Sequence, residues 1–276
     1  MAACEKVSIA VDTRDASQSK VFTFALKGDF DNAFYGGETR GYMQANGQDL
    51  TDLWVFDYVD GSCVQSLHQT PEDEYWGKPS LPLAYGSHHI YFVASRGADY
   101  TVDNEAGTIT WGRVSDTFWT DYSVQVVSTS NGNRAVTLDR VATKLKITVT
   151  DEVPSGISSV AITPSVWYYG IDYITGEAVE AQSNISRTIS VPSSYVGTSG
   201  TLSMIIFGIS PSTEWSADVS IAAKDGENAT IGQASIRESW FMRNRSTEYS
   251  GPLFGSNGTM VISVNDTWDD PATGTW

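Results

Sequence analysis

Alternation of apolar and polar residues is the dominant pattern along this chain. Within residues 21–26, the large apolar side chains of Phe22, Phe24 and Leu26 fall at every second position. A run of the same kind covers residues 145–149. A period of two places successive side chains on opposite faces of a β-sheet, so each run predicts a strand with one buried face.

Similar short runs recur to the end of the chain, and stretches rich in Gly, Pro, Asn and Ser separate them. Asp60 and Gly61 form a typical hairpin turn between two of these runs. Apart from a short helix over residues 71–76, the pattern predicts an all-β fold. The predicted strands cover residues 5–11, 21–26, 51–58, 62–67, 89–94, 108–111, 122–127, 136–138, 145–149, 157–163, 186–191, 201–207, 216–222, 229–236 and 259–264.

The chain has 276 residues, which suffices for one large β-domain or two of ordinary size. Strand-rich sequence lies on both sides of residues 134–149, near the middle of the chain. Short strands at this spacing are typical of β-sandwiches and β-barrels. We therefore predict an N-terminal β-domain over residues 5–139 and a C-terminal β-domain over residues 140–276.

Charge and motif content argue against several functions. With 17 basic and 33 acidic residues, the formal net charge is −16, and phosphate backbones repel such a chain, so we expect no nucleic-acid partner. The side chains of His88 and His89 should point to opposite faces of a strand, and no spacing of metal ligands occurs. Nucleophile elbows, phosphate loops and dinucleotide fingerprints are absent from the sequence. We expect neither enzymatic activity nor a cofactor.

Two features near the start of the chain are candidates for processing. Ala2 and Ala3 precede Cys4, as small residues precede the lipid-accepting Cys of a bacterial lipoprotein signal. Cys4 is thus a candidate lipidation site, and the alternative is an ordinary free thiol near the terminus. Arg40 lies within the Gly-rich residues 28–47, in a loop that a protease could reach.

Clustered aromatic residues allow two interpretations. Trp167, Tyr168 and Tyr169 are consecutive, and Trp119 belongs to a second group. Aromatic faces exposed on a β-sandwich can stack on sugar rings, which makes these four residues a candidate glycan platform. Alternatively, they fill the core and form cross-strand pairs, as aromatic residues commonly do.

Four segments together resemble the fimbrillins of type V pili, and in particular their lipid-anchored base subunits. Residues 2–4 resemble a lipoprotein start, and residues 52–57 resemble an early strand of the first domain. Residues 136–145 resemble the strand pair that opens the second domain. The fourth segment, residues 243–251 followed by 261–268, resembles the C-terminal part of the family.

The resemblance implies two tandem transthyretin-like β-sandwich domains in a cell-surface, outer-membrane lipoprotein. It implies that Cys4 carries the lipid and that other fimbrial subunits are partners through β-strand exchange. Base subunits of the family keep their first strand, which ends the fibre. The best candidate donor strand comprises Thr259, Met260, Val261, Ile262, Ser263 and Val264.

Two other functions stay open. In polymerising pilins of the family, an Arg-directed protease removes the first strand, and a cut at Arg40 would release residues 21–26. A second alternative, from a different class, is a glycan-binding surface lipoprotein that uses the aromatic platform. The favoured prediction is a structural subunit of cell-surface fimbriae, the lipid-anchored base at which assembly terminates.

Overall fold

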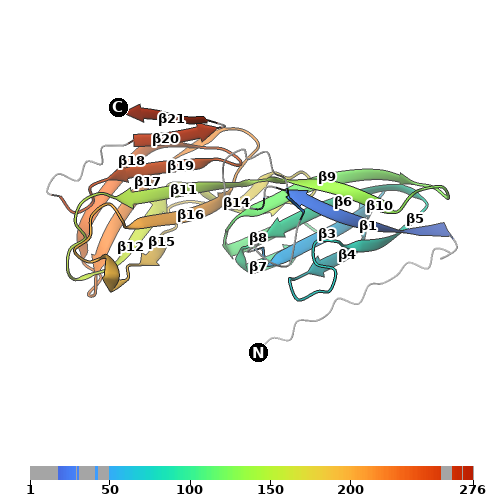
Figure 1. The fold of residues 1–276 in the computed structure, drawn as a ribbon, viewed down its shortest axis with the longest axis horizontal. Coiled ribbons are helices and arrows are strands. Elements are labelled where there is room, and N and C mark those ends of the chain that lie inside the picture. The colour runs from blue at the N-terminus through green and yellow to red at the C-terminus, as the bar shows by residue number, and fades with distance from the viewer. Residues whose placement is uncertain are drawn as a thin grey trace. The chain divides into compact units, whose positions relative to one another are not determined.

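The computed structural model describes residues 18–28, 30, 41–42, 50–255, 263–268 and 270–275. Side chains are described for residues 18–28, 30 and 50–255. The predicted strand at residues 5–11 and the positions of Cys4 and Arg40 lie outside these ranges. Nearly all of the regular secondary structure in the described part of the chain is β-strand (Figure 1), which confirms the predicted all-β class.

The chain divides into two compact units that interleave along the sequence. The first unit comprises Met1–Asp31, Thr39–Arg96 and Phe118–Asp139. The second comprises the described residues of Gly97–Thr117 and Arg140–Trp276. The domain limits at 5–139 and 140–276 stay a prediction, since the second unit also takes a segment from the first half of the chain.

One eight-stranded sheet forms the first unit. Its strand order is β2-β1-β10-β9-β6-β3-β4, and β5 pairs with β1. The turn between β3 and β4 has positive φ at Asp60 (51°) and Gly61 (77°), as the predicted hairpin requires. The strands are β1 (Ser19–Gly28), β2 (Gly41–Tyr42), β3 (Asp52–Val59), β4 (Ser62–Gln69), β5 (Ser80–Ala84), β6 (Gly86–Ser95), β9 (Thr117–Val126) and β10 (Asn133–Arg140).

The sheet of the first unit encloses its own core. The ring centroids of Phe24 on β1 and Phe92 on β6 lie 5.2 Å apart, although β10 and β9 separate these strands in the sheet. The sheet therefore curves until its two ends face each other. Phe118 on β9 and Leu138 on β10 contribute to the same apolar cluster.

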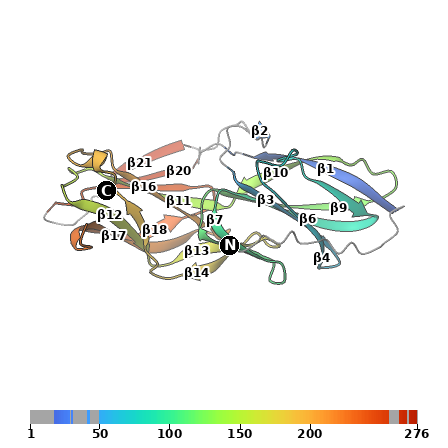
Figure 2. The ribbon, with the colours of Figure 1, turned by 90° about the horizontal axis from the view of Figure 1, so that it is seen from below.

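The second unit contains three sheets, with strand orders β16-β11-β19-β20-β21, β15-β12-β17-β18 and β14-β13-β8-β7. Figure 2 shows them from a second direction. Their strands are β7 (Ala98–Asp103), β8 (Thr108–Arg113), β11 (Ala142–Val149), β12 (Ile157–Pro164), β13 (Trp167–Asp172), β14 (Ala178–Gln182), β15 (Arg187–Ser190), β16 (Ser203–Ile209), β17 (Trp215–Asp225), β18 (Thr230–Phe241), β19 (Ser246–Gly251), β20 (Ser263–Trp268) and β21 (Asp270–Thr275).

The first two of these sheets share one hydrophobic core. Leu145 and Ile147 on β11 belong to the same cluster as Val160 on β12 and Ile221 on β17. Each of these side chains is at most 1% exposed. Two sheets that bury a common apolar layer form a sandwich.

The predicted helix over residues 71–76 is wrong, because hydrogen bonds such as Trp76 N–H to the Asp73 carbonyl (3.1 Å) make a series of turns. Of the predicted strand over residues 259–264, only Ser263 and Val264 are described, and both lie in β20. No segment of the described chain is a helix with the length and apolar character that crossing a membrane requires.

Candidate functional site

Strand β1 occupies an interior position in the first unit. Along Thr23–Gly28 it runs parallel to β10, and along Ser19–Thr23 it runs antiparallel to β5. Beyond β5, the amides of Phe24 and Leu26 donate to the carbonyl oxygens of Pro79 (2.9 Å) and Gly77 (3.2 Å). The backbone of β1 is therefore hydrogen-bonded on both sides.

The side chains of β1 complete the core. Phe22, Phe24 and Leu26 are fully buried, whereas Val21 on the opposite face is 65% exposed, as the alternation predicts. Phe24 packs edge-on against Phe92 and Tyr122, with ring centroids 5.2 and 5.7 Å apart. Removing β1 would open a groove between β10 and β5. It would also remove the three apolar side chains of β1 from the core. Only a strand with the same alternation could refill it.

The predicted processing and anchoring residues stand outside the described chain. Arg40 directly precedes β2 in the sequence, and β2 pairs with β1 through Tyr42 to Lys27 and Gly41 to Gly28. Arg40 therefore lies, in sequence, between two paired strands of one sheet. Cys4 lies 15 residues before the first residue of β1, and its lipidation stays a prediction.

The described end of the predicted donor strand lies in β20, next to the edge strand β21 of a sheet in the second unit. β20, which contains Ser263 and Val264, pairs antiparallel with β19 through Asp266 to Thr247. It also pairs with β21, where Val264 lies opposite Gly274. Thr259, Met260, Val261 and Ile262 are outside the described residues, so the donor role stays a prediction.

A buried ionic cluster joins three distant segments of the second unit. The guanidinium of Arg140 donates to both carboxylate oxygens of Asp116, at 2.7 and 3.1 Å. It also donates to the Oδ1 atom of Asn244, at 2.7 Å. The side chains of Arg140 and Asp116 are each only 1% exposed. Arg140 and Asn244 both fall in segments that carry the family resemblance, and the structure gives them a structural role.

The predicted aromatic platform is divided between core and surface. Trp167 is 2% exposed, packs against Phe241 (5.0 Å) and donates from Nε1 to the carbonyl oxygen of Phe207 (2.9 Å). Its ring faces are therefore not free to stack on a sugar. Tyr168, Tyr169 and Trp119 are half-buried, and Trp119 belongs to the first unit, unlike the other three.

The histidines are structural where the structure describes their contacts. His88 is buried and His89 is exposed, which confirms their predicted divergence. The His88 ring bonds through Nδ1 to Asp57 (2.8 Å) and through Nε2 to the Ala84 carbonyl (2.9 Å). These two contacts hold the buried ring between the side chain of Asp57 and the backbone of Ala84.

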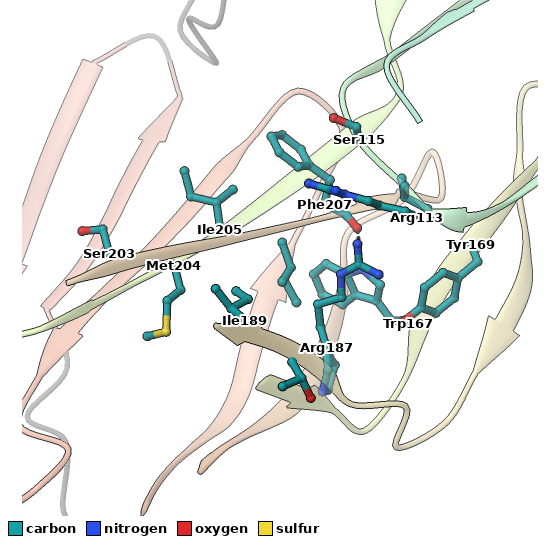
Figure 3. A pocket seen from close by; sticks show the side chains of 14 residues that line it. Arg113, Ser115, Trp167, Tyr169, Arg187, Ile189, Ser203, Met204, Ile205 and Phe207 are labelled. Carbon is teal, nitrogen blue, oxygen red and sulfur yellow. Dashed lines mark hydrogen bonds between the residues drawn. The ribbon is translucent and has the colours of Figure 1, made fainter. Parts of the chain in front are cut away.

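A cavity of about 350 Å³ lies in the second unit (Figure 3). Its walls come from consecutive residues of β15 and β16, together with Trp167, Tyr169 and residues 113–115. Two arginines, Arg113 and Arg187, line it. Burial raises the pKa of the Tyr169 hydroxyl, and the positive charge of Arg187 partly offsets that rise. Sequence periodicity gave no sign of this cavity, because its residues come from separate strands.

Known proteins resemble this chain in fold but not in sequence. No family model matches the chain, and a search of curated proteins finds no match. The solved structure of a proposed adhesin from Bacteroides ovatus is similar, with a TM-score of 0.55 at 10% identity, over 96% of this chain and 98% of that one. A proposed polysaccharide-binding protein from Bacteroides thetaiotaomicron also has a TM-score of 0.55, at 8% identity, over 89% and 95% of the two chains.

The fimbrial anchor protein Mfa2 from Porphyromonas gingivalis gives a TM-score of 0.48 at 10% identity, over 84% of this chain and 90% of that one. The first two comparisons show that this chain shares its all-β architecture with both proteins over nearly their whole length.

Proposed function

We propose that this protein is a structural, non-catalytic subunit of cell-surface fimbriae, the lipid-anchored base at which assembly by strand exchange ends. In this proposal Cys4 carries the lipid in the outer membrane, and the partners are other fimbrial subunits. The similar fold of a proposed adhesin supports a role at the cell surface. The resemblance of the sequence to base subunits supports the more specific role.

The position of β1 is the observation that carries this proposal. A groove that already holds β1 offers no free backbone edge to a donor strand, because β1 is paired with β10 on one side and β5 on the other. It also offers no empty core, because Phe22, Phe24 and Leu26 fill it. A subunit that keeps β1 therefore accepts no donor strand at this place.

A polymerising pilin is the alternative within the same class. A cut at Arg40 would break the covalent link between β1 and the rest of the sheet, and loss of β1 would then expose the groove. The base subunit differs because β1 stays in place. The two roles therefore predict different behaviour of one purified protein towards a protease.

Treatment with an Arg-specific protease should leave the protein monomeric, with β1 still bound. The measurement is size-exclusion chromatography together with mass spectrometry of the fragments. An Arg40→Gln variant is the matched control for cleavage at this position. Loss of β1 from the wild type followed by a ladder of oligomers, both absent in the control, would overturn the base-subunit role in favour of the pilin.

Replacing Cys4 with Ser should release the protein from the membrane and abolish its labelling with fatty acid. The experiment expresses the gene in a host that lipidates lipoproteins and measures label and membrane fraction. Cys63→Ser is the matched control, because Cys63 is half-buried in β4 and should not affect anchoring. Label that persists in Cys4→Ser, or disappears in Cys63→Ser, would contradict the anchor.

A glycan-binding surface lipoprotein is the alternative from another class. The similar fold of a proposed polysaccharide-binding protein supports it. The burial of Trp167 argues against the predicted stacking platform, because a buried ring cannot stack on a sugar. A glycan site would have to be built from other side chains.

A further inference from the structure

The cavity of the second unit has a local charge opposite to that of the whole protein. The chain has a formal net charge of −16. Yet the residues that line the cavity include the two cations Arg113 and Arg187 and no carboxylate. All of the lining residues belong to the second unit. Such a pocket attracts anions by charge alone.

Among the described residues, the side chains of the two cavity arginines lack the carboxylate partners that three other arginines of the same unit have. Arg140, Arg243 and Arg245 all bind carboxylates. The guanidinium groups of Arg113 and Arg187 form no hydrogen bond or ion pair with any described residue. Figure 3 draws both side chains among those that line the cavity, together with Trp167 and Phe207. Two cations that line one cavity repel each other, and an anion bound in the cavity would relieve that repulsion.

The geometry favours a compact ligand over an added β-strand. β16 is an edge strand, and five consecutive residues of it line the cavity. However, Trp167 already donates to the carbonyl oxygen of Phe207 and lies against Gly208, where an added Cβ would stand 2.6 Å from its Nε1 atom. The indole therefore blocks the continuation of a strand along this edge. A volume of about 350 Å³ suits a small molecule.

The remaining lining matches the surface of a sugar. Hydroxyl groups come from Ser115, Thr188, Ser203 and Tyr169, and can bond the hydroxyls of a ligand. Apolar surface comes from Ile189, Met204 and Ile206, and it can contact the C–H faces of a sugar ring. Guanidinium groups pair well with carboxylates, often through two parallel hydrogen bonds.

We propose that this cavity binds an acidic saccharide, with the carboxylate of a uronic or sialic acid held between Arg113 and Arg187. The site lies wholly in the second unit, so it requires neither strand exchange nor a lipid. Failure of this proposal would leave the fimbrial role untouched, and failure of the fimbrial role would leave this site untouched.

Isothermal titration calorimetry on the whole purified protein tests the site. The probes are methyl β-D-glucuronide and N-acetylneuraminic acid, with methyl β-D-glucoside as the neutral sugar and N-acetyl-dialanine as a carboxylate without a sugar. We expect saturable binding of at least one acidic sugar and none of the glucoside. Arg113→Gln and Arg187→Gln should each weaken that binding about tenfold or more, since each removes a charge-assisted hydrogen bond.

Arg237→Gln is the matched control. It removes the same charge from an exposed position on β18, outside the cavity, and should leave binding unchanged. Thermal unfolding of each variant checks that the fold is intact. Because Arg113 is exposed, Arg113→Gln should leave the core unchanged even if Arg187→Gln does not. The proposal is overturned by any one of four results: no saturable binding of either acid, equal binding of the glucoside, equally tight binding of N-acetyl-dialanine, or an equal loss in Arg237→Gln.

Discussion

Replacing Asp116 with Ala should lower the free energy of unfolding of the second unit by about 3–5 kcal/mol. The substitution leaves the guanidinium of Arg140 buried without its carboxylate. That guanidinium is 1% exposed and makes two of its hydrogen bonds to Asp116. Asn244 remains as a partner but carries no charge. Urea unfolding monitored by tryptophan fluorescence measures the change.

The double variant Asp116→Leu with Arg140→Met is the control for this expectation. It removes both charges and retains apolar volume, and such replacements of a buried pair are often close to neutral. We therefore expect the double variant to unfold at a higher urea concentration than Asp116→Ala. Equal destabilisation of the two variants would show that packing, rather than the unpaired charge, causes the loss.

Replacing Phe24 with Ala should destabilise the first unit by about 3–5 kcal/mol. Phe24 is fully buried in β1 and contacts the rings of Phe22, Phe92 and Tyr122. Truncation removes these contacts and leaves a cavity that surrounding strands cannot fill without moving. Thermal and urea unfolding measure the loss.

Val21→Ala on the same strand is the matched comparison. Val21 points to the opposite face and is 65% exposed, so its truncation should cost no more than about 0.5 kcal/mol. A similar loss of stability in both variants would contradict the one-sided burial of β1. It would also weaken the argument that β1 closes its groove by filling the core.

Strands and their buried faces could be predicted where the alternation is strong. The apolar positions of β1 and of β11 follow the period of two, and burial of these side chains is independent of which strand lies beside them. The turn at Asp60 and Gly61 was also predictable, because few residues tolerate positive φ. These are local properties, which depend on neighbours in the sequence.

Pairing partners and the cavity could not be predicted from the sequence. The parallel pairing of β1 with β10 joins segments about 110 residues apart, where alternation carries no information on the partner. The same holds for β8 and β13, which pair through Ile109 and Ile171. Trp167 illustrates the limit, since its burial depends on Phe241 and Phe207, which lie far along the chain.

Polar contacts to distant residues explain the role of Arg243, Asn244 and Arg245, which lie in one of the segments that carry the family resemblance. Arg243 donates to the carbonyl oxygens of Ser210 (2.9 Å) and Gly176 (2.6 Å). Arg245 donates to Glu214 at 3.0 Å, and Asn244 accepts from Arg140. In the sequence, these residues indicate only the family resemblance. In the structure, their side chains form hydrogen bonds that connect separate loops of the second unit.

The interleaving of the two units decides how the protein can be dissected. β7 and β8 are synthesised before β9 and β10, yet their sheet is completed only by β13 and β14. A fragment that ends after Asp139 would contain β8 but not β13. Ile109 would then lack Ile171, the residue opposite it in the sheet. A fragment that begins at Arg140 would lack Asp116, the carboxylate that Arg140 binds. We therefore expect that neither half folds independently. To express the second unit alone, residues 97–117 would have to be joined to the chain that begins at Arg140.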